Sequence, residues 1–317
     1  MPKLARLTTA VAVLTALGLT ACGSDPETET SGSELELVAS FYPLEFVTSR
    51  IAGDLASVET LTAPGVDPHE VELSPRSVGT VKEADLVVYS SGLQQAVDDA
   101  VRDMPSEQVL DVSEFADLVP LQAHQDGSPE SEAESSHEGH DHEDGLDPHF
   151  WLDPERMASV TRAVADRMGK TDPDHASTYQ ANADALVADL QSVQAEYDEG
   201  LAECEQQTMV TTHEAFGYVA RAHGFDMIGI AGLSPETEPS PARLAEVAHV
   251  VEDTGVDVVY SEVLLSQDIA DTVAAETGTQ VLLLDPIEGL TEDSPGADYL
   301  SVMRSNLQTL REGQECA

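Results

Sequence analysis

Short apolar runs alternate with amphipathic segments along this chain from residue 35 onward. Two segments open with a Ser-Pro pair, Ser74-Pro75 and Ser240-Pro241, which is typical of a helix N-cap followed by proline in the first turn. Strands that alternate with helices indicate parallel sheets built from βαβ units. We therefore predict an α/β fold in which two α/β lobes, each with a central sheet flanked by helices, use the following strands: Leu35–Ser40, Val58–Leu61, Asp85–Tyr89, Val109–Asp111, Thr208–Thr212, Asp226–Ile230, Val256–Ser261 and Gln280–Leu284.

A long helical segment separates the two groups of strands. Residues 173–201 contain no glycine or proline between the first residue and Gly200, and a helix of this length reaches roughly 40 Å. One long rigid helix of this kind should join the lobes stiffly and allow only small closure motions. We place the N-terminal lobe at 35–172 and the C-terminal lobe at 202–317.

The N-terminal segment has the pattern of an exported lipoprotein. Residues 1–22 contain a basic start, an apolar stretch and the ending Leu19-Thr20-Ala21-Cys22, which resembles a bacterial lipobox in which Cys22 is acylated. Cleavage of an ordinary signal peptide nearby is the alternative. Residues 23–34 are Gly, Ser, Thr and acidic residues with few apolar side chains, a composition that favours a flexible acidic tether. This pattern predicts an extracytoplasmic protein, periplasmic where an outer membrane exists.

The formal charge is strongly negative. Fourteen Lys and Arg against 60 Asp and Glu give −46, so the surface repels phosphate backbones and we expect no binding to nucleic acid. A cationic partner, a metal ion or a saline environment is compatible with this charge. A merely soluble, repulsive surface is the alternative interpretation.

Histidines gather in one segment that cannot form a core. Five of the ten histidines lie between residues 124 and 149, and the segment 124–146 contains no Lys or Arg. Its side chains favour loose, auxiliary binding of divalent cations, with an incidental solvated insertion as the alternative. The histidines assigned to this auxiliary role are His124, His137, His140 and His142.

Two cysteines remain after the lipobox, Cys204 and Cys316. An oxidising exterior permits a disulfide, which would stabilise the fold by about 4 to 5 kcal/mol for a loop of this size. Two free thiols or a soft metal ligand are the alternatives.

Four side chains follow predicted strands or turns in places where a ligand site forms in open α/β sheets. His69 and His149 come from the first half of the chain, and His213 and Asp285 come from the second. Three imidazoles and one carboxylate suit tetrahedral Zn²⁺. Each residue alone is equally compatible with an ordinary cap or turn. Glu262, at the end of another strand, is a possible orienting group or alternate ligand.

Several independent motifs occur in one order along the chain: Ser40–Leu44, Ile51–Asp54, Gly65–His69, Lys82–Tyr89, Asp147–Pro154, Thr212–Tyr218 and Leu284–Ile287. In these segments the chain resembles the solute-binding lipoproteins of metal-specific ABC importers. The resemblance implies two α/β lobes joined by a rigid helix, with metal ligands at His69, His149, His213 and Asp285. Manganese members of that family usually carry Glu where this chain has His213, so the resemblance is to the zinc branch.

The sequence thus predicts a lipid-anchored zinc receptor that captures Zn²⁺ between two lobes and delivers it to an ABC permease, without enzymatic activity. Because ligation requires neutral imidazoles, affinity should weaken below about pH 6. The alternatives are a manganese importer component, a zinc-bound surface adhesion or sensing lipoprotein, and a hydrolytic zinc enzyme with Glu262 as base.

Overall fold

The structure is a computed structural model that describes residues 35–121, 145–232 and 239–317. The predicted signal peptide, the predicted acylation site Cys22, the predicted tether and the four histidines assigned to auxiliary binding (His124, His137, His140 and His142) lie outside the described residues. Among the helices in the described ranges, none combines the length and apolar character needed to cross a bilayer.

Two four-stranded sheets organise the described chain, and every strand pair in them is parallel. The strand order is β2-β1-β3-β4 in the first sheet and β6-β5-β7-β8 in the second. All eight predicted strands are present, with ends that differ from the prediction by at most two residues. The strands are β1 (Leu35–Ala39), β2 (Ala56–Thr60), β3 (Leu86–Tyr89), β4 (Val109–Asp111), β5 (Thr208–Thr211), β6 (Asp226–Gly229), β7 (Val258–Ser261) and β8 (Gln280–Leu283).

Each strand order reverses at an internal strand. The chain passes from β1 to β2 on one side and then to β3 on the other, and it does the same from β5 to β6 and β7. Such reversals open a crevice at the carboxyl ends of the strands. In chain order, the α-helices of the described ranges are α1 (Tyr42–Ala52), α2 (Pro75–Glu83), α3 (Gln95–Val101), α4 (Pro154–Thr171), α5 (Ala176–Gly200), α6 (Gly217–His223), α7 (Pro241–Thr254), α8 (Asp268–Thr277) and α9 (Tyr299–Gly313).

The strands divide their side chains between separate apolar cores, as the two-residue period of a strand requires. In β1, Leu37 lies in a large central core while the neighbouring Val38 lies in a smaller core with residues of α2 and α3. In β5, Met209 lies in the central core and Val210 in another small core with residues of α7 and α8. The central core therefore includes side chains from both sheets and ties the two halves together.

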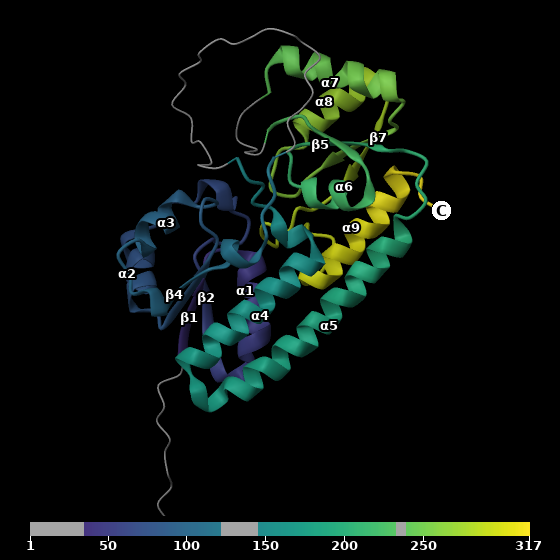
Figure 1. The fold of residues 1–317 in the computed structure, drawn as a ribbon. Coiled ribbons are helices and arrows are strands. Elements are labelled where there is room, and N and C mark those ends of the chain that lie inside the picture. Colours follow the sequence, from purple (N-terminus) through teal and green to yellow (C-terminus); the bar gives the residue numbers. More distant parts are fainter. Residues whose placement is uncertain (1–34, 122–144, 233–238) are drawn as a thin grey trace, which may run out of the picture. The chain divides into compact units, whose positions relative to one another are not determined.

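Helix α5 is the long helix expected between the two groups of strands. It starts at Ala176, after a short turn at Pro173–His175, and it contacts α4 and α1 along one part and α9 along another (Figure 1). Asn182 donates to the carbonyl of Ile51 at 2.9 Å, and the Tyr197 hydroxyl donates to the carbonyl of Met303 at 2.7 Å. These buried and half-buried contacts fasten α5 to both halves, whereas our exact lobe boundaries remain a prediction.

The predicted helix N-caps form the expected hydrogen bonds. The Ser74 hydroxyl accepts a hydrogen bond from the backbone N–H of Ser77, and Ser240 accepts one from Arg243. Asp153 caps α4 in the same manner ahead of Pro154. Each cap satisfies an N–H group that has no partner inside its helix.

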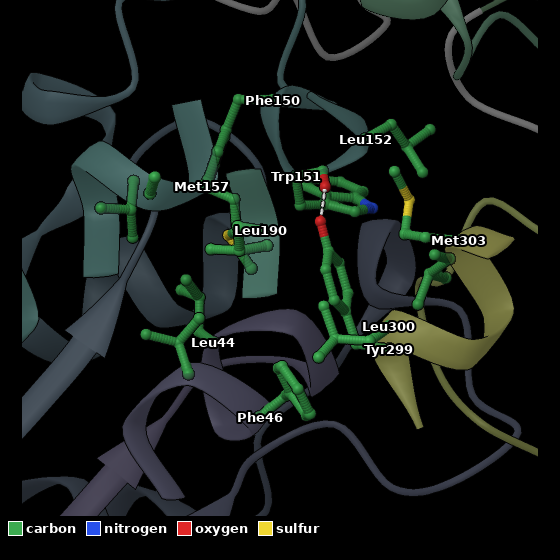
Figure 2. Packing of buried hydrophobic residues seen from close by; sticks show 14 of the residues in the cluster. Leu44, Phe46, Phe150, Trp151, Leu152, Met157, Leu190, Tyr299, Leu300 and Met303 are labelled. Atoms are coloured by element: carbon green, nitrogen blue, oxygen red, sulfur yellow. Dashed lines mark hydrogen bonds between the residues drawn. The ribbon is translucent and has the colours of Figure 1, made fainter. Parts of the chain in front are cut away.

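Aromatic side chains fill the central core between α1, α9 and the segment that follows His149. Figure 2 shows the Tyr299 hydroxyl of α9 donating to the carbonyl of Trp151. Phe46 of α1 stacks on the Tyr299 ring with 5.3 Å between centroids. The segment that follows His149 is therefore hydrogen-bonded to α9, and α9 in turn packs on α1.

The predicted disulfide is confirmed. Cys204 and Cys316 are bonded, and they close a loop with a sequence separation of 112 residues. The side chain of Gln314, next to this bridge, donates to the carbonyl of Thr208 and accepts from the Tyr260 hydroxyl. The end of the chain is thus attached to strands β5 and β7.

Candidate metal centre

Four buried side chains converge at the carboxyl ends of the strands. They are His69, His149, His213 and Glu288, and one potential ligand atom from each lies within 4.8 Å of the others. His69 follows β2 and His213 follows β5, while His149 precedes α4 and Glu288 follows β8. The fold brings together residues from both sheets because both sets of parallel strands direct their carboxyl ends toward this region.

His69 sits in a tight turn that Asp67 starts. The Asp67 carboxylate accepts the backbone N–H of His69 at 2.8 Å, and Pro68 fixes the first position of the short 3₁₀ turn that carries the imidazole. The turn leaves the His69 side chain only 4% exposed. Pro and Asp in this spacing thus direct the imidazole inward.

His149 is oriented by a carboxylate two residues earlier. Oδ1 of Asp147 accepts hydrogen bonds from both the backbone N–H and the Nδ1–H of His149, at 3.0 and 2.9 Å. Because a carboxylate only accepts, the neutral imidazole carries its proton on Nδ1. Its buried Nε2 has no hydrogen-bond partner among the described residues and presents a free lone pair.

His213 is oriented in the same way by Glu262. Oε2 of Glu262 accepts from Nδ1 of His213 at 2.7 Å, and Oε1 accepts from the His213 backbone N–H and from the Thr212 hydroxyl. Nε2 of His213 is again buried without a hydrogen-bond partner in the described ranges. Glu262 therefore has the geometry of an orienting group and not of an alternate ligand, since both of its oxygens already accept hydrogen bonds.

Glu288 occupies the centre of the group. Its Oε1 lies 3.2 Å from Nε2 of His69, 3.6 Å from Nε2 of His149 and 3.4 Å from Nε2 of His213. The Glu288 side chain is 2% exposed, and the imidazoles of His149 and His213 are fully buried. One carboxylate oxygen therefore faces three imidazole nitrogens in a region closed to solvent.

Asp285, the carboxylate that the sequence suggested, is not a member of this group. Its Oδ1 accepts the backbone N–H of Ile287 at 2.8 Å, and Asn306 of α9 holds its backbone N–H and carbonyl at 3.0 and 2.6 Å. Ile287 adopts a φ of 60°, which turns the chain so that Glu288, three residues after Asp285, reaches the imidazoles. Burial raises the pKa of Asp285 to about 6, an environment that disfavours its anion.

The sequence carried a weak signal for Glu288. It stands in Asp285-Pro-Ile-Glu-Gly289, between a proline and a glycine, directly after the edge strand β8. The position directly after a strand favours Asp285, although a loop that contains proline and glycine can turn any of its side chains toward the crevice.

The imidazoles and Glu288 shift one another's protonation. Burial alone would lower the pKa of His213, but the carboxylates of Glu262 and Glu288 outweigh it and hold that pKa well above its usual value. The pKa of His149 is raised in the same way by Asp147 and Glu288 against the effect of burial. Burial would raise the pKa of Glu288, yet the three imidazoles keep it well below its usual value. The group therefore favours positive charge beside Glu288, supplied by protons or by a cation.

The geometry fits a tetrahedral metal ion. Ligands that surround Zn²⁺ at about 2.0 to 2.1 Å lie roughly 3.3 to 3.4 Å from one another, close to the separations between Glu288 Oε1 and the three Nε2 atoms. The pairs that are farther apart, up to 4.8 Å, have to approach as an ion enters. Within the described residues, no second group of three or more such side chains is found. The remaining histidines of the helical regions, His175, His223 and His249, lie apart from it.

Comparison with known proteins agrees with this geometry. Residues 37–313 match the family described as zinc-uptake complex component A, periplasmic. The chain is 36% identical over 307 residues to the zinc-binding lipoprotein AdcA of Streptococcus pneumoniae, covering 95% of this chain but 60% of that protein. It is 32% identical over 300 residues to the high-affinity zinc uptake system protein ZnuA of Bacillus subtilis, covering 92% of each.

A solved structure has the same architecture. The Zn(II)-bound ZnuA-like domain of Streptococcus pneumoniae AdcA superposes with a TM-score of 0.72 and 33% identity, over 89% of this chain and 99% of that domain. The family match spans both sheets and all four converging side chains. The chain therefore belongs to the family of the periplasmic component A of zinc-uptake complexes.

Proposed function

We propose that this protein is an extracytoplasmic receptor that binds one Zn²⁺ through Nε2 of His69, His149 and His213 and a carboxylate oxygen of Glu288. The observation that carries this proposal is the convergence of buried Nε2 atoms on Glu288 Oε1, two of them without hydrogen-bond partners in the described chain. Unpaired buried lone pairs are costly unless a ligand uses them.

The donor set favours zinc over manganese. Three imidazole nitrogens and one carboxylate oxygen match tetrahedral Zn²⁺, whereas Mn²⁺ prefers more oxygen donors in an octahedral shell. The names of the relatives, a zinc-binding lipoprotein and a zinc uptake protein, agree with this choice.

The bound zinc is delivered to an ABC permease and is not used for catalysis. A catalytic zinc usually keeps one open position for water, whereas Glu288 supplies a fourth protein ligand. Glu262, the base required by a hydrolytic mechanism, has both oxygens engaged by His213 and Thr212. The family's place in zinc-uptake complexes supports a permease partner.

The location follows from the sequence pattern. Acylation of Cys22 anchors the mature protein to the membrane, and residues 23–34 form the tether. The auxiliary histidines of segment 124–146 bind further Zn²⁺ weakly. Mass spectrometry of the membrane fraction, with Cys22→Ala as the comparison, tests the anchor.

Metal content and competition titration of residues 23–317 test the receptor. We expect one tight zinc equivalent that is lost in His213→Ala, together with weaker equivalents that disappear on deletion of residues 126–144. Tight binding that depends on the deleted segment, or a preference for Mn²⁺, would contradict the proposal. Restoration of zinc-limited growth in a cell lacking its zinc receptor tests delivery.

A further inference from the structure

We propose that Gly217 is a positioning residue for the zinc site, because the space left by its missing side chain lets the Asp147 carboxylate hold His149. The inference rests on the proposed function, since His149 is taken as a zinc ligand. It concerns residues outside the four ligands and links helix α6, beside the second sheet, to the orientation of an imidazole that precedes α4.

Asp147 is fixed by its backbone on two sides. The Tyr218 hydroxyl donates to the carbonyl of Asp147 at 2.7 Å, and the N–H of Asp147 donates to the carbonyl of Val119 at 2.9 Å. The Tyr218 hydroxyl in turn accepts the N–H of Val119 at 3.3 Å. The residue is 3% exposed. Its carboxylate can therefore move only by rotating its own side chain.

Gly217 lies directly against that carboxylate. A Cβ built at position 217 would lie 2.5 Å from Oδ2 of Asp147, closer than real carbon and oxygen atoms approach, and its next contacts are 3.7 Å from Cγ of Asp147 and 3.8 Å from Cε of Met227. The φ of Gly217 is not in the left-handed region, so the backbone does not require glycine. The Asp147 carboxylate is the obstacle that excludes a side chain here.

A methyl group at position 217 would force the Asp147 carboxylate to rotate away from His149. The Nδ1–H of His149 would then lose its acceptor, and neither the tautomer nor the ring direction would remain fixed. A partner of this kind, which binds the far nitrogen of a metal-ligating histidine, typically contributes 10- to 100-fold to metal affinity. We expect Gly217→Ala to weaken zinc binding by about this factor.

A double-mutant cycle separates this role from a general packing defect. Zinc affinity is measured by competition titration for the wild type, Gly217→Ala, Asp147→Ala and the double variant. Because Asp147→Ala removes the obstacle, the double variant should bind zinc as tightly as Asp147→Ala alone, with no additional loss. Full additivity of the two losses would overturn the proposal.

Gly79→Ala is the matched control. Gly79 is also a helical glycine, in α2, and the surroundings described in the structure leave nothing within 4 Å of a Cβ there. The zinc affinity of the Gly79→Ala variant should equal that of the wild type. An equal loss in Gly79→Ala and Gly217→Ala would contradict a specific role for Gly217.

Nitrogen-15 NMR of the imidazoles gives a readout that a structural defect would not reproduce. In the metal-free wild type, above the imidazole pKa, His149 should be a single Nδ1–H tautomer, and in Gly217→Ala and Asp147→Ala it should be a mixture. An unchanged tautomer in Gly217→Ala would overturn the proposal. Should Gly217→Ala fail to fold, a folded double variant with the tautomer mixture and affinity of Asp147→Ala supports it, and a double variant that also fails contradicts it.

Failure of the proposed function has a different signature. A wild-type protein without a tight zinc site would refute the receptor assignment, while the tautomer of His149 would still report on Gly217 and Asp147. A wild-type protein with one tight site, matched by an equally tight Gly217→Ala variant, would refute only the positioning role.

Discussion

The indole N–H of Trp151 donates to the carbonyl of Pro286 at 2.7 Å, and this hydrogen bond joins the segment that follows His149 to the loop that leads to Glu288. Both groups are buried, and Trp151 also packs edge-to-face on Phe41. Two candidate ligands from opposite halves of the chain are therefore held at a set distance by a contact that does not involve the metal. This contact should limit the movement of His149 and Glu288 relative to each other when zinc binds.

Trp151→Phe should weaken zinc binding and destabilise the fold. The substitution leaves the buried carbonyl of Pro286 without its donor, which costs about 1 to 3 kcal/mol, and it loosens the loop that carries Glu288. Chemical denaturation and zinc titration measure the two effects. Tyr197→Phe is the control, since it removes a hydroxyl that donates to a different buried carbonyl, that of Met303. It should lose stability but keep zinc affinity; equal zinc affinities in both variants would argue against the coupling.

Glu288→Gln should weaken zinc binding, whereas Asp285→Asn should leave it unchanged. Loss of the Glu288 charge removes the only carboxylate among the four converging side chains, so zinc affinity should fall by at least 10-fold. Asp285→Asn keeps an oxygen that can accept from the Ile287 N–H, and zinc stoichiometry should be unchanged. Because the pKa of Asp285 is raised to about 6, its ionised form opposes folding, and the Asn variant should be more stable by about 2 to 3 kcal/mol near pH 8. A greater zinc defect in the Asp285 variant would reverse this assignment.

Zinc affinity should continue to rise with pH above the ordinary histidine range. The sequence alone suggested weakening below about pH 6. The pKa of His213 is held well above its usual value by Glu262 and Glu288, despite burial, so protons compete with zinc to higher pH. Zinc competition titrations across pH, with the number of protons released on binding, measure this. An affinity that does not change between pH 6 and 8 would contradict it.

The metal-free protein should lose stability at high pH, where zinc affinity is still rising. The raised pKa of His213 means that its contribution is fully present below the unfolded imidazole value of about 6.5 and is lost as pH rises through the folded pKa. The lowered pKa of Glu288 means that its contribution is present above the unfolded value and is lost as pH falls through the folded pKa. Melting temperatures of the metal-free protein should be highest between these limits, and Glu288→Gln should flatten the profile.

Removal of the disulfide should affect stability more than zinc binding. Cys204 and Cys316 close a loop with a separation of 112 residues, and a double Ser substitution should cost about 2 to 5 kcal/mol by releasing that constraint in the unfolded chain. None of the four converging side chains contacts this bridge in the described structure. Denaturation and zinc titration of the double variant test both parts, and loss of tight zinc binding in a folded variant would show an unexpected link to the site.

The local elements of this protein can be predicted from its amino-acid sequence. Each of the eight strands is a short apolar run, and the helix starts at Ser74, Asp153 and Ser240 depend on caps only a few residues away. Periodicity and capping act over a few residues, so they can be read without knowing the fold. The predicted acylation of Cys22 leaves Cys204 and Cys316 as one pair, so a disulfide between them was an expectation from the sequence, with free thiols or a soft metal ligand as alternatives.

Long-range packing selects the carboxylate that joins the three imidazoles. Asp285 and Glu288 are three residues apart, and the turn at Ile287, together with the hold of Asn306 on Asp285, directs Glu288 inward. The partnership of Asp147 with Gly217 depends on α6, about seventy residues later, packing against the segment before His149. These relationships arise from the path of the backbone through a shared core, and sequence patterns that act over a few residues do not encode them.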